Sequence, residues 1–352
     1  MTMDYKTSSI VTNRPPEKKK TAGAWLSRIF ENKYIGLVAF AIALLMPFII
    51  ATPYSLNVMT TAAIFVVLAA GLNIVVGYCG LLDLGYVAFL AVGAYTAGIL
   101  SKAFELPVLF TLPAVIVMTI LAGLIIGAPT LRLRSDYLAI VTLGFGEITR
   151  ITANNLTITG GPSGIFGIPG FLVIGDIDFQ NPVIFYYVTV VIVAGLVLAA
   201  ARLGKSRLGR AWKFVKEDED AAEAMGIHTY KVKLLAYIFG AIWGGFGGML
   251  FAAHITAVSP MSFVFLQSAL VLMAVVLGGM GNMKGVVLGA LVISLVPEFL
   301  REFSDYRYLL FGVLLVVVMV FRPQGLWPPH ASEAERAKAK LDTAAIQNGL
   351  AR

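Results

Sequence analysis

The segment Gly204-Lys205-Ser206 has the residue order that ends a phosphate-binding loop, where a lysine contacts the phosphates and a hydroxyl binds Mg²⁺. The full pattern needs a glycine five positions before Gly204, and that position is Ala199. A continuous apolar segment also precedes the motif, whereas a phosphate-binding loop follows a strand. We therefore expect no ATP hydrolysis by this chain and predict that it is not an enzyme.

Cysteine and histidine are too few and too scattered for a metal site. The chain has one cysteine, Cys79, and three histidines, His228, His254 and His330, which lie far apart in the sequence. Protein metal sites gather three or four such ligands at short spacings. We predict no metal, no cofactor and no catalytic residue, and interpret His254 as a hydrogen-bonded residue near the end of a helix.

Four polar residues lie within or beside long apolar segments: Asn73, Asp83, Glu147 and Arg150. An unpaired charge at membrane depth costs about 2.5–3.5 kcal/mol, so we expect charged residues at this depth to have a structural or functional role. Glu147 and Arg150 are three residues apart and share a helical face. Either they form an internal ion pair, or all four residues are polar elements of a translocation path. For Asp83 a structural cap before the next helix is the favoured interpretation.

Glycine clusters lie beside polar residues in three segments: near Asn73 and Asp83, near Glu147 and Arg150, and near Asn282 and Lys284. Segments 76–85 and 277–285 read VGYCGLLDLG and LGGMGNMKG, and their weak mutual similarity suggests an internal repeat. Glycine beside polar residues is typical of broken helices that line a substrate path. The glycines at 244–248 stand apart from charges, so we interpret them as a site of close helix packing.

Residues 216–227, KEDEDAAEAMGI, predict a short helix of about two turns. The acids suit its first turn through the helix dipole, and Gly226 suits its end. We expect Ala222 and Met225 on one side and the acids on the other. The pattern alone leaves open whether the helix docks onto a partner or is only solvated.

Composition places all these residues in a membrane protein. Of 352 residues, 58% are apolar and 13% charged, and the mean hydropathy is +0.84. This excludes a soluble enzyme, a nucleic-acid-binding domain and a disordered regulator. Continuous apolar runs of about 20 residues predict helices rather than barrel strands. We predict an all-α polytopic protein with about ten transmembrane helices, at 34–52, 56–77, 81–101, 107–128, 137–153, 183–201, 234–257, 262–282, 286–300 and 308–321.

The positions of the basic residues predict the orientation. With the N-terminus inside, 23 of the 27 Lys and Arg residues face the cytoplasm, and basic loops stay on that side. The high pI of 9.4 is then a consequence of topology, not of nucleic-acid binding. We predict cytoplasmic tails at 1–33 and 329–352, a membrane domain at 34–328, a cytoplasmic loop at 202–233 and an ordered or lid-like external loop at 154–182.

Several segments together resemble the LivM-type permease subunits of branched-chain amino acid ABC importers. The resemblance runs from about residue 34 to 328. It is carried by GLNIVVGYCGLLDLGYVAFLAVGAYTAGIL (71–100), LRLRSDYLAIVTLGFGEITR (131–150), NNLTITGGPSGI (154–165), EDEDAAEAMGI (217–227), VVLGGMGNMKGVVLGALVI (275–293) and FRPQGLWP (321–328).

The resemblance implies an ABC importer permease fold and a set of partners. These are a sister permease, two cytoplasmic ATP-binding subunits and a periplasmic or extracellular substrate-binding protein, within the lipid of the bacterial inner (plasma) membrane. Asp220, Ala221, Ala222 and Gly226 match the family's EAA-x3-G coupling helix, with Asp220 in place of the usual glutamate. In that family this helix docks into a groove of the ATPase.

The implied function is import of leucine, isoleucine or valine delivered by the binding protein, along a path at the interface with the sister permease. A permease of the same class for urea, short amides or other amino acids is an alternative. An ion-coupled secondary transporter is a further one, and it would need acids at membrane depth that act as ion sites.

Overall fold

The computed structural model describes residues 35–49, 52–131, 135–174, 177–303, 306, 309, 312–313, 316, 320 and 325–327. The predicted tails and most of the predicted span 308–321 lie outside these residues. The chain divides into two compact units, residues 1–43 and 44–352. In the first unit, the described residues 35–43 belong to one helix, α2, which extends over Ile35–Ile49.

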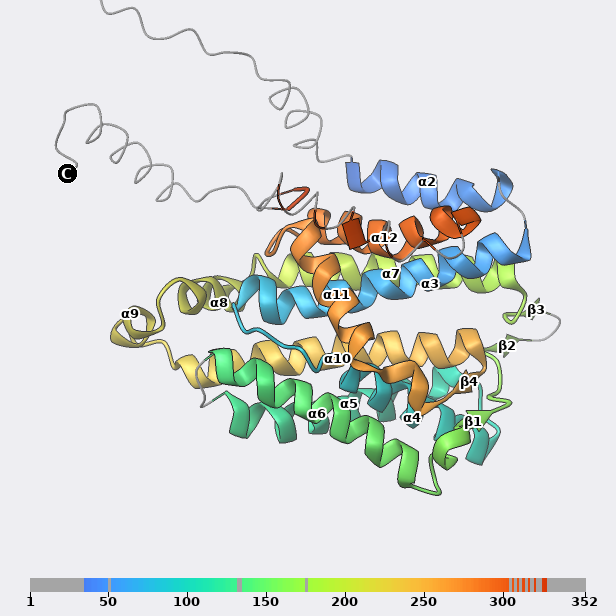
Figure 1. The fold of residues 1–352 in the computed structure, drawn as a ribbon, viewed down its shortest axis with the longest axis horizontal. Helices are drawn as coiled ribbons and strands as arrows, with labels where there is room; N and C mark the ends of the chain where they lie inside the picture. The colour runs from blue at the N-terminus through green and yellow to red at the C-terminus, as the bar shows by residue number, and fades with distance from the viewer. Residues whose placement is uncertain are drawn as a thin grey trace, which may run out of the picture. The chain divides into compact units, whose positions relative to one another are not determined.

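The second unit is a helical bundle with a few very short strands (Figure 1). Its helices are α3 (Pro53–Leu72), α4 (Val87–Phe104), α5 (Leu112–Thr130), α6 (Ser135–Asn155), α7 (Pro182–Leu203), α8 (Arg207–Glu217), α9 (Glu219–Ala224), α10 (Thr229–Ile255), α11 (Phe265–Gly278) and α12 (Met283–Phe299). A π-helix, η1 (Asn73–Tyr78), continues α3, and short 3-10 turns are η2 (Val108–Thr111), η3 (Gly161–Ser163), η4 (Pro260–Phe263) and η5 (Leu300–Phe303). The strands are β1 (Ile165–Phe166), β2 (Val173–Ile174), β3 (Ile177–Asp178) and β4 (Ala257–Val258).

Five helical segments among the described residues are long and apolar enough to cross a membrane: Pro53–Tyr78, Val87–Phe104, Val108–Thr130, Pro182–Leu203 and Thr229–Ile255. They correspond to the spans predicted at 56–77, 81–101, 107–128, 183–201 and 234–257. The predicted spans 34–52, 137–153, 262–282 and 286–300 correspond to α2, α6, α11 and α12, which are helical but shorter or more polar. A predominantly helical fold is confirmed.

The start of the third predicted span is wrong. We expected a helix from residue 81, but α4 begins at Val87. Gly80 adopts a φ of +77°, a conformation that breaks a helix, and residues 81–86 form an irregular connection. Apolar composition alone did not distinguish this buried connection from the helix that follows it.

Helix α10 lies at the centre of the unit and packs against α3, α4 and α5. A Cβ atom on Gly248 would lie 2.2 Å from the carbonyl oxygen of Leu90, and one on Gly93 would lie 2.5 Å from that of Gly245. The backbones of α4 and α10 are therefore in direct contact. This confirms the interpretation of the glycines at 244–248 as a site of close packing.

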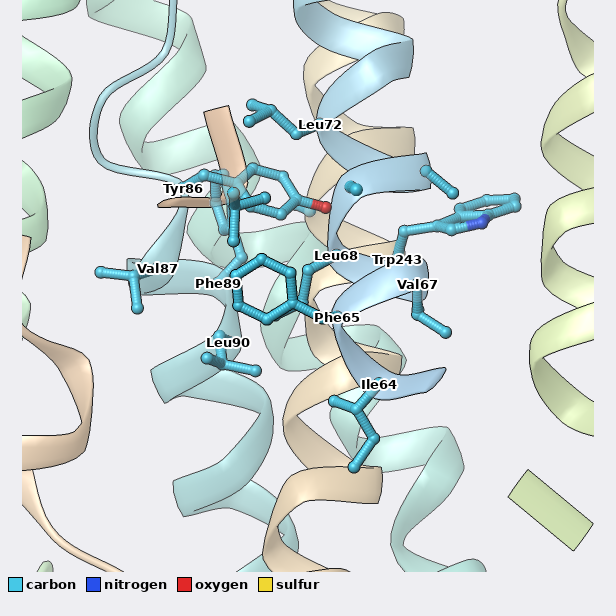
Figure 2. Close-up of a cluster of buried hydrophobic side chains, with 14 of the residues drawn as sticks. Ile64, Phe65, Val67, Leu68, Leu72, Tyr86, Val87, Phe89, Leu90 and Trp243 are labelled. Carbon is cyan, nitrogen blue, oxygen red and sulfur yellow. The ribbon is translucent and has the colours of Figure 1, made fainter. Parts of the chain in front are cut away.

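The core next to this contact is apolar with one polar anchor (Figure 2). Leu68 of α3, Phe89 of α4 and Trp243 of α10 are buried there, together with Tyr86. The Tyr86 hydroxyl donates a hydrogen bond of 2.8 Å to the carbonyl oxygen of Gly240. This bond joins the connection before α4 to the middle of α10. It also satisfies two polar groups that water does not reach.

Short strand pairs hold the described residues of the loop predicted at 154–182. Strand β1 pairs antiparallel with β4, with Ile165 opposite Val258, and β2 pairs antiparallel with β3. The first pair attaches the loop to the end of α10. In Figure 1 the strands lie at one end of the bundle, and α8 and α9 lie at the other.

Candidate functional site

The acid-and-alanine segment forms a short helix, as predicted, but over fewer residues. Helix α9 extends over Glu219–Ala224, whereas residues 216 and 217 belong to the end of α8. The Asp218 carboxylate caps α9 by accepting a hydrogen bond of 3.0 Å from the amide of Ala221. Gly226 follows with a φ of +82°, which lets the chain turn back towards α10.

The predicted sides of α9 are partly wrong. Asp220, Ala221 and Gly226 are exposed, but Ala222 is only 4% exposed and packs against the rest of the chain. Met225 is 83% exposed. The helix ends at Ala224 and Met225 has non-helical dihedrals, so the helical periodicity that would put Met225 beside Ala222 no longer applies. The exposed surface of this segment therefore excludes Ala222.

Helix α8 fixes this segment to the bundle through two hydrogen bonds. The buried indole of Trp212 donates to the carbonyl oxygen of Val232 at 2.8 Å. The Lys216 ammonium donates to the carbonyl oxygen of Gly77 at 2.9 Å, and Gly77 lies in the π-helical end of α3. The segment is thus connected directly to a membrane-spanning helix rather than suspended on flexible loops.

An ion pair that sequence analysis missed holds α9 to α10. Glu219 pairs with Lys233, which lies in the first turns of α10. The side chain of Lys233 is 10% exposed and that of Glu219 is 47% exposed. A lysine near the start of an apolar helix was the available indication, but only the fold brings it close to an acid 14 residues away.

Asn73 is buried at the start of η1, where it joins the two glycine-rich segments. Its Oδ1 atom accepts a hydrogen bond of 2.9 Å from the amide of Gly281. A Cβ atom on Gly77 would lie 2.7 Å from that same amide nitrogen, so the two segments touch through their backbones. The segments that resemble one another in sequence therefore pack together in space.

Asp83 is fully buried in the connection between η1 and α4. Its Oδ1 atom accepts a hydrogen bond of 2.8 Å from the amide of Gly85, and the Thr142 hydroxyl accepts one of 3.1 Å from the amide of Leu84. Burial raises the pKa of Asp83 to about 6, although the Gly85 amide offsets part of this effect. The residue before α4 is Tyr86, so Asp83 shapes the preceding turn instead of capping the helix itself.

Glu147 and Arg150 form an ion pair on α6, as one of the two interpretations predicted. The Arg150 Nε atom donates to both carboxylate oxygens, at 3.0 and 3.1 Å. Both side chains are partly exposed. Within the described part of the chain, no hydrogen bond or ion pair connects Asn73, Asp83 and Glu147 to one another. Participation of these residues in a translocation path stays a prediction.

Comparisons with known proteins show which family the chain belongs to. The family described as "Branched-chain amino acid transport system / permease component" matches residues 54–319. The "High-affinity branched-chain amino acid transport system permease protein LivM" of Salmonella typhimurium (strain LT2) is 41% identical over 321 residues, which are 85% of this chain and 75% of that protein. The protein of the same name from Escherichia coli (strain K12) is 41% identical over 84% of this chain and 74% of its own length.

A second kind of permease protein is also similar, but over a shorter stretch. The "High-affinity branched-chain amino acid transport system permease protein LivH" of Escherichia coli (strain K12) is 28% identical over 34% of this chain and 40% of its own length. No solved structure matches the chain significantly. The family match and the LivM relatives together show that this multi-pass membrane protein belongs to the family of permease components of branched-chain amino acid transport systems.

Proposed function

We propose that this chain is the LivM-type permease subunit of an ATP-driven importer for leucine, isoleucine and valine. The observation that carries the proposal is the 41% identity over 85% of the chain to a permease protein named for branched-chain amino acid transport. The apolar helices of the bundle provide the membrane-spanning part. A permease changes only which side of the membrane its substrate can reach, so transport requires no covalent chemistry on this chain.

The proposed topology places ten spans in the bacterial inner membrane, with both termini and the loop 202–233 in the cytoplasm and the loop 154–182 outside. The asymmetry of the basic residues supports it, because cytoplasmic loops retain Lys and Arg. The position of α8–α9 at the opposite end of the bundle from the strands agrees with this orientation (Figure 1). Tails 1–33 and 329–352 flank the membrane domain in this scheme.

The proposed partner of α9 is a cytoplasmic ATP-binding subunit. The exposed residues Asp220 and Ala221 of α9, with Met225 and Gly226 directly after it, form a small mixed surface that suits a groove on another protein. The anchoring of α8 through Lys216 supports a mechanical role, because force on the segment would reach α3 through a short hydrogen-bonded route. Two such ATPases, a sister permease related to LivH and an external binding protein complete the importer.

The proposed path lies at the interface with the sister permease, and Asn73, Asp83, Glu147 and Arg150 are its polar candidates. Glu147 lines a cavity of about 200 Å³ together with residues of α4 and α11, which supports a role beyond packing. The ion pair on α6 keeps its two charges compensated within a largely apolar surface.

Uptake measurements test the substrate and the energy source. Vesicles that contain the complete transporter should accumulate labelled leucine when supplied with ATP, and unlabelled leucine should compete, whereas urea and glutamate should not. Competition by urea would instead assign the chain to the amide-type permeases. Uptake that persists without ATP while an ion gradient is held would indicate a secondary transporter.

The docking surface has its own test. Met225→Asp should lower transport and the coupling of ATP hydrolysis to it without changing the amount of protein in the membrane. Phe214, which is also exposed but lies on α8, provides the matched control variant Phe214→Asp. If Met225→Asp transports normally, α9 does not dock through this surface.

A further inference from the structure

A polar pocket lies at the end of the bundle opposite α8–α9, between the start of α3, the end of α10 and the end of α12. Its volume is about 440 Å³, within the range of about 300–1,000 Å³ typical of small-molecule sites. Its lining combines a carboxylate, an imidazole, hydroxyls and an amide with aliphatic side chains: Tyr54, Asn57, Val58, Thr61, His254, Ile255, Ser294 and Glu298.

One oxygen of the carboxylate in this pocket accepts no hydrogen bond from the described residues. The Oε1 atom of Glu298 is buried and accepts no hydrogen bond there. The Arg301 guanidinium forms an ion pair with this atom at 3.7 Å, beyond hydrogen-bonding distance, and rests over the ring of Tyr54 at 4.7 Å. A buried charged oxygen without a donor costs free energy, so a ligand that supplies a donor would be favoured.

The other wall of the pocket is held in a fixed geometry. The imidazole of His254 stacks on the buried ring of Phe185, with ring centres 5.6 Å apart and an interplanar angle of 6°. Its Nε2 atom lies 3.4 Å from the hydroxyl oxygen of Thr61. An imidazole constrained in this way is suited to orient a ligand, since it loses little conformational entropy on binding.

We propose that this pocket is an amino acid binding site on the permease, on the side from which substrate arrives. The Glu298 carboxylate accepts hydrogen bonds from the α-ammonium group, and Arg301 at the rim pairs with the α-carboxylate. Val58 and Ile255 contact the aliphatic side chain. The inference rests on the proposed function for the substrate class and adds to it the residues that recognise that substrate.

The test uses the complete transporter, purified in lipid nanodiscs without the binding protein, and measures direct binding of labelled leucine. Glu298→Gln should weaken leucine binding at least tenfold, because the charge that pairs with the ammonium is lost. The matched control is Glu105→Gln, which removes an exposed acid at the end of α4. Glu298→Asp should restore part of the affinity, because it keeps a carboxylate at this position.

A second measurement identifies the group that Glu298 recognises. 4-Methylpentanoate, which is leucine without its ammonium group, should not compete with leucine on the unchanged protein, and the preference for leucine should shrink in Glu298→Gln. Equal leucine binding by Glu298→Gln and Glu105→Gln would overturn the proposal that this pocket binds leucine. The same conclusion would follow if the unchanged protein imported leucine but bound none. Absence of leucine uptake by the unchanged transporter would instead overturn the proposed function and, with it, this choice of ligand.

Discussion

The ion pair between Glu219 and Lys233 predicts an asymmetric response to mutation. Glu219→Gln leaves the ammonium of Lys233 largely buried without a countercharge, since that side chain is only 10% exposed. Lys233→Met places an apolar side chain in the same site, and Glu219, which is 47% exposed, can turn to water. We therefore expect Glu219→Gln to loosen α9 more than Lys233→Met does.

The magnitude follows from the burial of the two partners. Removing one partner of a fully buried pair costs about 3–5 kcal/mol, and exposed pairs contribute about 1 kcal/mol or less. With one partner half-exposed, we expect about 1–2 kcal/mol for Glu219→Gln. One factor of ten in an equilibrium corresponds to about 1.4 kcal/mol, so local opening of α9 should increase about 5- to 30-fold.

Hydrogen–deuterium exchange of the permease in nanodiscs measures this opening. The amide of Ile227 donates to the carbonyl oxygen of Ala222, so its exchange reports on whether the end of α9 remains folded. The double variant of Glu219 and Lys233 should exchange like Lys233→Met alone. Faster exchange in Lys233→Met than in Glu219→Gln, or additive effects in the double variant, would refute the reasoning.

Three further predictions concern the bundle. Gly248→Leu should remove most folded protein from the membrane because its Cβ would overlap the backbone of α4, whereas Gly195→Leu, whose Cβ would meet nothing within 4 Å, should accumulate normally on membrane immunoblots. Lys216→Met should lower the thermal unfolding midpoint, by the loss of about 1–2 kcal/mol from its hydrogen bond to Gly77, as measured by fluorescence. The pKa of Asp83 is raised to about 6, so the folded protein binds a proton at this residue more tightly than the unfolded chain does. The free energy of unfolding should therefore fall as pH rises from about 4 through 6, and Asp83→Asn should flatten that decline in thermal scans.

The sequence was sufficient to predict a helical membrane protein, because its continuous apolar runs are long enough to cross the hydrocarbon core of a bilayer as helices. It also predicted the short helix around Ala221 from its acids, its alanines and Gly226. The length of the connection before α4 was not predictable in the same way. Its residues are as apolar as those of a membrane helix. Only the turn at Gly80 and the buried carboxylate of Asp83 distinguish this connection from the helix that follows.

Contacts between distant segments were the least predictable part of the site. The pairing of Glu219 with Lys233 depends on how α9 folds back onto α10, and the hydrogen bond from the Gly281 amide to the Asn73 side chain spans 208 positions. Helical periodicity placed Ala222 and Met225 together, but the helix ends between them. His254 is a hydrogen-bonded residue near the end of α10, as expected, but its neighbours Phe185 and Thr61 come from two other helices and were not predicted.

The glycine-to-backbone contacts between α4 and α10 limit how this protein can change shape. Side chains at an interface act as adjustable spacers, and they can switch rotamers when two helices slide past each other. Where Gly93 contacts Gly245 and Gly248 contacts Leu90, no such spacers exist, so α4 and α10 must move together as one rigid body. In the transport cycle proposed above, alternation between outward-open and inward-open states then has to occur at seams lined by larger residues.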